Sequence, residues 1–496
     1  MEHTLGKLVE GKTPKQVSEL KIVDPACGSG SFLIGAYDYL LNWHLRWYIE
    51  NSPDKHRKAN AIFEHEVHTD DGMTSEWRLT VEKKRDILMS NIYGVDIDSQ
   101  AVEVTKLSLL LKVLEGETAE TINSQPSFFR ERALPDLDEK NIKCGNSLIG
   151  HDFYDNEQMT LLGFDEQRRI NTFDWVEAFP QVFEGDNPGF DVVIGNPPYI
   201  FTRELLTEVE RQYFSVKYQT SWEKQNTYML FMELLLRSLG KNGLGGYIVP
   251  NSWLTIESAR LLRSVVVPKI ESVADLNYTV FNKVSMEPCI FTIRGSNSEN
   301  PVSVVQANSK DSFVEAKSQQ RDRERWSGPE WRIVFSATAD SARVVDKIVK
   351  NSKSVGQLFD VRSGLQAYEK GRGNPPQTAE DVENHVFDRD QKENENSVAY
   401  LGGSDVQRFG LEWSGLWMQY GSWLSQPREF GIFSRPRVLL REITSEFPNC
   451  LNAVYVEDAY LNNKSVLNIL ALNDDSTDLK CLLAILNSRL ISLYYK

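Results

Sequence analysis

A short turn at residues 195–199, Gly-Asn-Pro-Pro-Tyr, carries groups that suit a planar amino group as ligand. It directly follows the apolar run 190–194, which is typical of a buried strand. The Asn196 side-chain oxygen and the Pro197 carbonyl can each accept one hydrogen of an exocyclic NH2, because proline rings fix φ and hold the carbonyl in place. Tyr199 offers a flat face for stacking, a contact of roughly 1–3 kcal/mol for a nucleobase. The turn indicates chemistry on an amino group of a conjugated substrate, although Asn-Pro also marks ordinary turns.

A glycine-rich turn lies upstream, where the apolar residues 22–24 lead into Pro-Ala-Cys-Gly-Ser-Gly at 25–30 and a predicted helix begins at Ser31. Such a strand, turn and helix start bring backbone N–H groups and positions without Cβ against a ligand. The three-glycine dinucleotide fingerprint is not met. Asp96 ends the next acidic strand and can take the ribose hydroxyls of a nucleoside cofactor. Its distance from the glycines exceeds the usual spacing of about 20 residues, which predicts an insertion between them.

Four motifs follow one another along the chain: DPACGSG at 24–30, GVDID at 94–98, CGNSL at 144–148 and NPPY at 196–199. In this order they resemble the motifs of S-adenosylmethionine-dependent DNA adenine-N6 methyltransferases of the gamma class. Residues 31–34, 101–108 and 246–250 further resemble the methyltransferase part of type IIG restriction–modification enzymes and of phage-exclusion methyltransferases. The resemblance covers most of the chain and is strongest from about residue 20 to 295.

The resemblance implies a role for each motif residue. The Asp24 turn would face the methionine part of S-adenosylmethionine, Asp96 its ribose, and Ile97 and Asn146 its adenine; many relatives have Asp where Asn146 stands. The cofactor set that it implies is Asp24, Ala26, Gly28, Ser29, Gly30, Asp96, Ile97, Asn146 and Ser147. The catalytic set is Asn196, Pro197, Pro198, Tyr199 and Phe281. Phe281 resembles the aromatic residue that stacks on the other face of the flipped base, but it also fits a core phenylalanine at a strand end.

The acceptor chemistry predicts base flipping. An adenine amino group inside a duplex is paired and out of reach, so the base must enter a pocket at a cost of a few kcal/mol of unstacking. Positioning in line with the methyl donor then supplies much of the rate. This chemistry needs no metal, and His56, His65 and His68 fit a solvated insertion better than a metal site.

The order of predicted elements is typical of a doubly wound, mainly parallel α/β sheet, and the resemblance implies the Rossmann-like form of it found in class I methyltransferases. We assign residues 1–295 to this methyltransferase domain, with insertions at about 51–90 and 151–189. Residues 296–496 change in character, and several short segments resemble the target-recognition domain of the same family. We therefore expect a mixed α+β domain for DNA specificity there, in incomplete form.

Composition limits the class of protein. The chain has 496 residues, and its five cysteines show no paired spacing, which favours a reducing compartment. It has no signal segment and no apolar run long enough for a membrane helix, so we predict a cytoplasmic, monomeric protein without a membrane partner.

The formal net charge is −15, of which residues 1–300 carry −13. Double-stranded DNA would therefore need a local basic patch, which we expect in the second part. The arginines proposed for phosphate contacts are Arg362, Arg408, Arg435, Arg437 and Arg441.

Several alternatives stay open. Relatives extend further at both ends and carry a Tyr-Thr-Pro motif where this chain has only Lys12-Thr13-Pro14-Lys15, which suggests a truncated member whose nuclease is separate or missing. A specificity fragment that binds DNA without turnover is one alternative. Protein-glutamine methyltransferases also use Asn-Pro-Pro-Tyr, but they are small and lack a long C-terminal domain. Cytosine-N4 methylation is disfavoured because those relatives usually have Ser at the position of Asn196.

Overall fold

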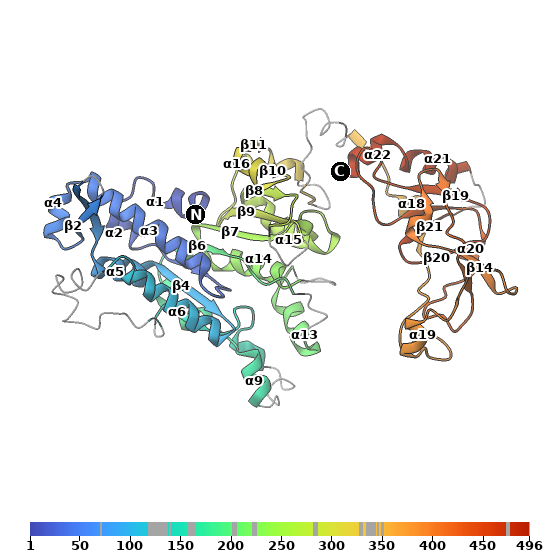
Figure 1. Ribbon diagram of the computed structural model, residues 1–496, viewed down its shortest axis with the longest axis horizontal. Coiled ribbons are helices and arrows are strands. Elements are labelled where there is room, and N and C mark those ends of the chain that lie inside the picture. The colour runs from blue at the N-terminus through green and yellow to red at the C-terminus, as the bar shows by residue number, and fades with distance from the viewer. Residues whose placement is uncertain are drawn as a thin grey trace. The chain divides into compact units, whose positions relative to one another are not determined.

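The computed structural model describes residues 1–69, 72–117, 137, 140–155, 164–200, 206–220, 226–280, 286–326, 331–333, 344, 347–348, 352–472 and 477–495. The chain divides into two compact units, Met1–Phe335 and Ser336–Lys496 (Figure 1).

The first unit is built on a nine-stranded sheet with the order β11-β10-β8-β9-β7-β6-β1-β4-β5. Strands β5, β4, β1, β6 and β7 run parallel, and β9 pairs antiparallel with both β7 and β8. The strands are β1 Ile22–Asp24, β4 Ile92–Asp96, β5 Ile142–Cys144, β6 Phe190–Gly195, β7 Leu239–Pro250, β8 Ile270–Leu276, β9 Pro288–Arg294, β10 Val302–Ala307 and β11 Gln319–Arg321. The strand order reverses between β1 and β6, and ligands of open α/β sheets bind at the carboxyl ends of strands at such a point.

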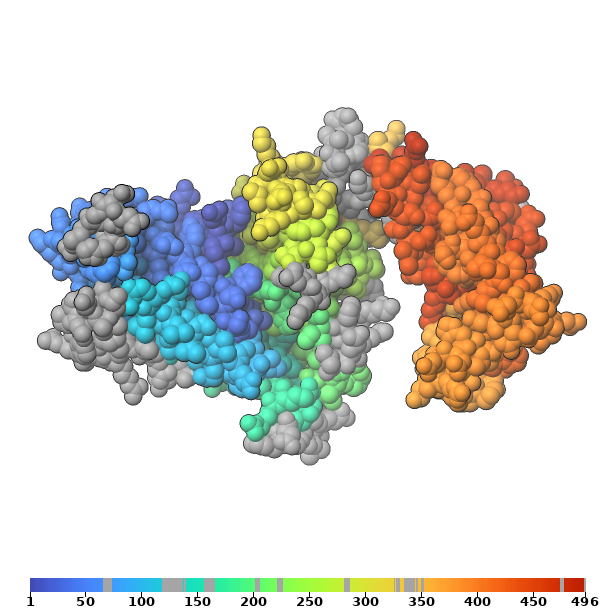
Figure 2. Space-filling model, in the orientation of Figure 1, coloured from blue at the N-terminus to red at the C-terminus, as the bar shows by residue number. Residues whose placement is uncertain are grey.

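Helices cover both faces of this sheet because alternate strand residues point to opposite sides. On one face, Ile22 and Ile194 pack with the apolar sides of α3 (Ser31–Glu50), α5 (Val81–Asn91) and α6 (Ser99–Leu114). On the other face, Val23 and Val193 pack with α14 (Thr227–Ser238) and α15 (Arg260–Val266). The outer surface of α6 is visible in the cyan part of Figure 2. The doubly wound class I methyltransferase fold predicted for this part is confirmed.

The segments between these elements form short structures of their own. Strands β2 (Ile62–Thr69) and β3 (Gly72–Leu79) pair as a separate two-stranded hairpin within the predicted insertion at about 51–90. Further α-helices among the described residues of the unit are α1 Lys7–Val9, α2 Pro14–Val17, α4 Pro53–Lys58, α9 Phe164–Ile170, α10 Trp175–Ala178, α11 Pro180–Phe183, α13 Glu208–Lys217 and α16 Lys310–Glu315.

The second unit contains two four-stranded sheets, β12-β21-β18-β19 and β13-β17-β14-β20, and a small pair β15-β16. The strands of the first sheet are β12 Phe359–Ser363, β18 Arg437–Arg441, β19 Ala453–Val456 and β21 Val466–Ala471. Those of the second are β13 Asp388–Arg389, β14 Ser397–Leu401, β17 Trp417–Gln419 and β20 Leu461–Asn462, and the small pair is β15 Val406–Gln407 and β16 Gly410–Leu411. The α-helices in the described part of this unit are α18 Val355–Leu358, α19 Ala379–Glu383, α20 Gly431–Ser434, α21 Thr477–Leu486 and α22 Arg489–Tyr495. Helix α21 packs on the first sheet through Leu479, Leu482 and Leu486.

The boundary between the two units lies further along the chain than the boundary predicted from the sequence. Strands β10 and β11 extend the sheet of the first unit beyond residue 295, so that unit continues to Phe335. Strand β10 pairs parallel with β8, which is why the change of composition near residue 295 does not mark the end of the sheet. The functional roles assigned to the two parts stay predictions.

Candidate active site at the carboxyl ends of β1, β4, β5 and β6

Asp24 ends β1 and is buried beneath the turn that follows β6. Its side chain is 1% exposed, and its Oδ1 accepts a hydrogen bond of 3.0 Å from the Ala26 N–H. A Cβ added to Gly195 would lie 2.6 Å from this oxygen, so only glycine permits so close an approach of β6 to β1. Burial raises the pKa of Asp24 to about 7, and the nearby Asp96 carboxylate adds to the rise. The residue before Asn196 therefore lies directly against the first predicted cofactor residue.

The glycine-rich turn is tied to β4 through Asp96. The Gly28 N–H donates to Asp96 Oδ2 over 2.8 Å, and the Asp98 N–H donates to Asp96 Oδ1 over 3.0 Å. Gly28 and Gly30 have φ values of +53° and +83°, a region that favours glycine. A Cβ at Gly28 would meet no heavy atom within 4 Å, which leaves open space beside the carboxylate. Asp96 keeps unused lone pairs on both oxygens that can accept from a ligand.

The β5 loop completes this side of the site. The buried Ser147 hydroxyl donates to the Pro25 carbonyl over 2.6 Å and so joins the β5 loop to the β1 turn. Asn146 Oδ1 accepts from the Leu148 N–H over 3.1 Å, which leaves the amide nitrogen as its donor group. Ile97 is 50% exposed beside these loops, so its apolar side chain is open to a ligand. Ser29 is exposed in the same turn, and its hydroxyl lies 3.4 Å from that of Ser31.

The Asn-Pro-Pro-Tyr turn follows β6 at the same edge of the sheet. Tyr199 donates its hydroxyl to Asn196 Oδ1 and also lies 2.9 Å from the Ile248 carbonyl. Pro197 is buried, Pro198 is exposed, and Asn196 and Tyr199 are half-buried. Burial raises the pKa of Tyr199 far above its ordinary value, so this hydroxyl stays a donor at neutral pH.

Phe281, the fifth predicted catalytic residue, lies outside the described residues. The structure brings the other predicted residues to one edge of the sheet. Their roles stay predictions.

Sequence reasoning missed the residues that hold these loops from behind. Thr105 in α6 donates to the Gly28 carbonyl over 2.7 Å, and its side chain would lie 3.0 Å from a Cβ at Gly30. Tyr218, which follows α13, donates to the Leu148 carbonyl over 2.9 Å, and Trp175 Nε1 donates to the Ser147 carbonyl over 3.1 Å. Trp175 and Tyr218 are aromatic residues in polar stretches of the sequence, a signal that could have found them, whereas Thr105 carries no such signal.

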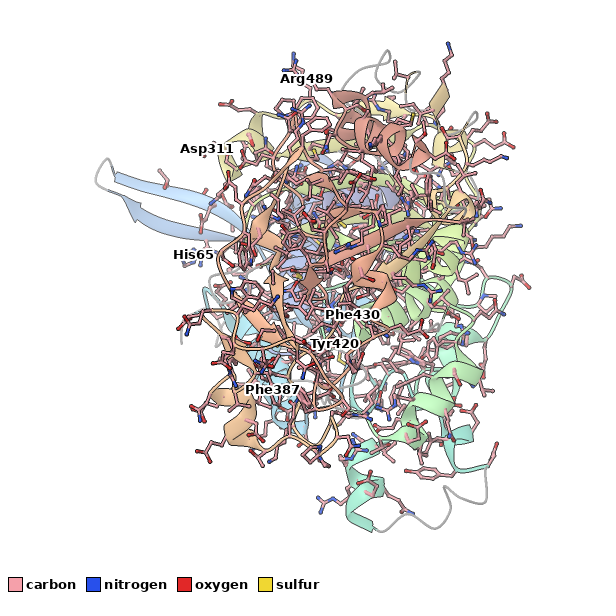
Figure 3. All side chains as sticks on the ribbon, turned by 90° about the vertical axis from the view of Figure 1, so that its right-hand side faces the viewer. His65, Asp311, Phe387, Tyr420, Phe430 and Arg489 are labelled. Carbon is pink, nitrogen blue, oxygen red and sulfur yellow. The ribbon has the colours of Figure 1, made fainter. Side chains whose placement is uncertain are left out.

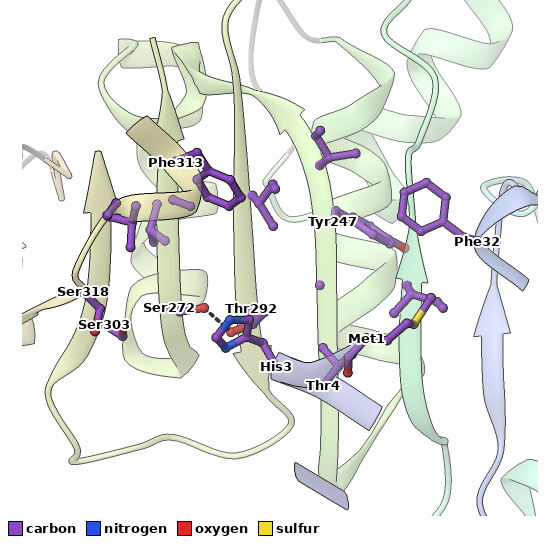
Figure 4. Close-up of a pocket in the computed structure, with 18 residues that line it drawn as sticks. Met1, His3, Thr4, Phe32, Tyr247, Ser272, Thr292, Ser303, Phe313 and Ser318 are labelled. Atoms are coloured by element: carbon purple, nitrogen blue, oxygen red, sulfur yellow. Dashed lines mark hydrogen bonds between the residues drawn. The ribbon is translucent and has the colours of Figure 1, made fainter. Parts of the chain in front are cut away.

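A cavity of about 590 Å³ lies beside the site on a face of the sheet (Figure 4). Its walls include Phe32, Ile194 and Tyr247, and the Tyr247 hydroxyl is buried without a hydrogen-bond partner among the described residues. None of the described residues predicted for the cofactor or for catalysis lines this cavity.

In the part of the chain that the structure describes, no three His, Cys, Asp or Glu side chains gather as metal ligands would. Over the same residues, the helices are too short or too polar to cross a bilayer.

The structure corrects one of the arginines expected to contact DNA phosphates. Arg437 is fully buried and donates to the carbonyls of Arg435, Asp458 and Tyr460 and to Asn468 Oδ1. It is wrong as a phosphate contact, because β18 places it inside the sheet of the second unit, where its guanidinium satisfies backbone carbonyls.

Two further arginines of that set have partners within the unit. Arg362 is exposed but pairs with Asp360 at 2.7 Å, and Arg408 donates to the Asn487 carbonyl. A phosphate would compete with these partners.

Two regions of the chain match known protein families. Residues 90–281 match the Eco57I restriction-modification methylase family, and residues 398–496 match the TaqI-like C-terminal specificity domain. The chain is 30% identical over 345 residues to the type II restriction enzyme and methyltransferase RM.Eco57I of Escherichia coli, covering 68% of this chain and 29% of that protein. It is 23% identical over 284 residues to the adenine-specific methyltransferase PglX of Lacticaseibacillus casei, covering 50% of this chain and 21% of that protein. The chain thus spans less than a third of the length of these two relatives.

Solved structures share the fold. The type IIL restriction-modification enzyme MmeI, in complex with DNA, aligns with a TM-score of 0.53 at 13% identity, over 96% of this chain and 59% of that chain. A nuclease-deletion mutant of the type ISP enzyme LlaGI aligns with a TM-score of 0.55 at 11% identity, over 94% of this chain and 40% of that chain. The chain is therefore homologous to type II restriction–modification methyltransferases, with an Eco57I-type methylase region followed by a TaqI-like specificity region.

Proposed function

We propose that this chain transfers a methyl group from S-adenosylmethionine to the exocyclic N6 of a flipped adenine in double-stranded DNA. In this proposal it acts within a restriction–modification or phage-defence system, as the methyltransferase and target-recognition part. The observation that carries the proposal is the contact between the two halves of the site. The β1 turn and the Asn196 turn meet at Gly195, where a Cβ would lie 2.6 Å from Asp24 Oδ1.

The residues of the first half fit S-adenosylmethionine. The Asp96 oxygens suit ribose hydroxyls, the open space beside Gly28 admits a ligand close to the backbone, and the exposed Ile97 suits an adenine ring. When bound, this cofactor supplies an electrophilic methyl group on a sulfonium. Nothing else in the proposal needs a metal or a covalent intermediate.

The second half of the site would hold the amino group. Asn196 Oδ1 already accepts from Tyr199, so one lone pair is left for one hydrogen of the substrate. The Pro197 carbonyl accepts the other. Two acceptors raise the electron density on the substrate amino nitrogen. They also fix the orientation of the amino group, so that it is held in a single reactive geometry. Tyr199 presents the ring on which the base stacks.

The second unit would read the DNA sequence. Aromatic side chains gather there, including Phe387, Tyr420 and Phe430 (Figure 3), and the Tyr420 and Phe430 rings lie 5.2 Å apart. Phe430 is 39% exposed, and the neighbouring Arg428 is exposed as well. Exposed aromatic and cationic side chains suit contacts with bases and phosphates.

The test is methyl transfer from tritiated S-adenosylmethionine to unmethylated bacterial genomic DNA. The proposal expects label in DNA and none in protein. Label in a glutamine-containing peptide would instead support protein-glutamine methylation, an alternative that only the shared Asn-Pro-Pro-Tyr motif supports. Binding of both cofactor and DNA without transfer would identify a specificity fragment. A monomeric state, a cytoplasmic location and a separate nuclease stay predictions.

A further inference from the structure

Thr227, the first residue of α14, anchors the Asn-Pro-Pro-Tyr turn through hydrogen bonds. The Thr227 hydroxyl donates to the Pro198 carbonyl over 2.6 Å and accepts from the Ile200 N–H over 3.1 Å. The Thr227 N–H in turn donates to the Ile200 carbonyl over 2.9 Å. Thr227 is 6% exposed, so water cannot easily replace these bonds. One side chain thus fixes the backbone on both sides of Tyr199.

This anchor also bears on the carbonyl that would accept the substrate amine. A threonine hydroxyl has one donor and two acceptor sites, and Thr227 uses the donor and at least one acceptor here. The ring of Pro198 fixes φ, so holding the Pro198 carbonyl also restrains the peptide plane that precedes the ring. That plane carries the Pro197 carbonyl.

Thr227 itself is held rigidly. Asn226 caps α14, since its Oδ1 accepts from the Tyr228 N–H over 3.4 Å. The Tyr228 ring meets the Tyr199 ring edge-on, with centroids 6.1 Å apart and planes at 84°, and its hydroxyl lies 3.3 Å from Ser252 Oγ. Helix α14 is buried along most of its length. The turn is therefore fastened to a buried helix of the core.

We infer that Thr227 is a positioning residue for the amino-group site, which sets the direction of the Pro197 carbonyl and the tilt of the Tyr199 ring. This inference rests on the proposed function, because it assigns Thr227 to the same methyl-transfer site. Thr227 does not touch the substrate; it acts through Pro198 and Ile200.

The test compares Thr227→Val, which keeps the shape but loses the hydroxyl, with Thr227→Ser, which keeps the hydroxyl. We expect Thr227→Val to lower kcat for methyl transfer by about 10- to 100-fold, as for a small misplacement of reacting groups. The Kd for S-adenosylmethionine should stay the same. Thr227→Ser should restore most of the rate.

Thr80→Val is the matched control. Thr80 is 1% exposed, donates to the Asn60 carbonyl over 2.8 Å and accepts from the Lys83 N–H over 3.2 Å at the start of α5. Thr80→Val therefore loses the same pair of hydrogen bonds, but at a helix start that does not hold the Asn-Pro-Pro-Tyr turn. This variant should leave kcat unchanged even if its stability falls.

Hydrogen–deuterium exchange of the Ile200 amide tests the anchor independently of activity. Exchange should rise in Thr227→Val and stay slow in Thr227→Ser. An active parent with an equally active Thr227→Val, or a Thr227→Ser no better than Thr227→Val, overturns the inference. An inactive parent contradicts the proposed function instead; in that case unchanged Ile200 exchange in Thr227→Val overturns the anchor, and increased exchange supports it.

Discussion

Asp96→Ala should weaken S-adenosylmethionine binding strongly, because the carboxylate lies against Gly28, beside which the structure leaves open space. A hydrogen bond to a charged group contributes about 1.5–3 kcal/mol. Since 1.4 kcal/mol corresponds to a factor of ten, Kd should rise by about 10- to 150-fold. Asp96→Asn keeps one oxygen acceptor and loses the charge, so its affinity should fall between those of the parent and Asp96→Ala.

Asp96 also accepts from the Gly28 and Asp98 backbone, so Asp96→Ala should lower the free energy of unfolding as well. Asp98→Ala separates the two effects. Asp98 caps α6 by accepting from the Gln100 N–H over 2.8 Å, and loss of such a cap costs about 1 kcal/mol of stability. Its backbone N–H to Asp96 remains, so cofactor affinity should be unchanged.

Isothermal titration calorimetry gives Kd for each variant, and urea denaturation gives its stability. Parental affinity in Asp96→Ala would refute the role of Asp96. An equal loss of affinity in Asp98→Ala would show that disturbance of the β4 loop alone explains the effect.

Three further predictions concern catalysis, pH and the second unit. Asn196→Ala should nearly abolish methyl transfer but keep cofactor affinity, because Tyr199 retains the Ile248 carbonyl as partner; parental turnover would contradict this. The folded-state pKa of Asp24, raised to about 7 by burial, lies above the unfolded value of about 3.9, so its contribution to stability is lost as pH rises between these values. The stability of Asp24→Asn relative to the parent should therefore increase by about 2–4 kcal/mol from pH 4 to pH 8. Urea denaturation measures this difference at each pH, and a constant difference would refute the pKa shift of Asp24. Arg437→Met should destabilise the second unit by about 2–5 kcal/mol, since buried carbonyls lose their donor, whereas the exposed Arg362→Ala should stay within about 0.5 kcal/mol; equal melting temperatures would contradict the assignment.

Much of the first unit could be predicted from sequence because its signals are local. The strands near residues 22–24, 92–96 and 190–194 are short apolar runs, and each is followed directly by motif residues. Parallel strands bring such turns to one edge of a sheet whatever lies between them. The motif residues could therefore be placed together without knowledge of the insertions.

The contacts that hold those turns could not be predicted, because they depend on tertiary packing. Thr227 reads as an ordinary helix-start threonine, and Thr105 as a polar residue in an apolar helix, until the fold brings each to a turn carbonyl. Arg437 shows the converse. Its charge suggested a surface contact with phosphate, but alternation along β18 turns it inward, and composition alone carries no such information. The end of the first unit was missed for a similar reason, because β10 and β11 join the sheet by long-range pairing.

The most direct test of the account is the chemical identity of the modified base. Unmethylated DNA would be incubated with S-adenosylmethionine and the parent chain or Asn196→Ala, digested to nucleosides and analysed by mass spectrometry. We expect N6-methyl-2′-deoxyadenosine with the parent and almost none with Asn196→Ala. Methylated cytosine, or equal N6-methyl signal with both proteins, would contradict it.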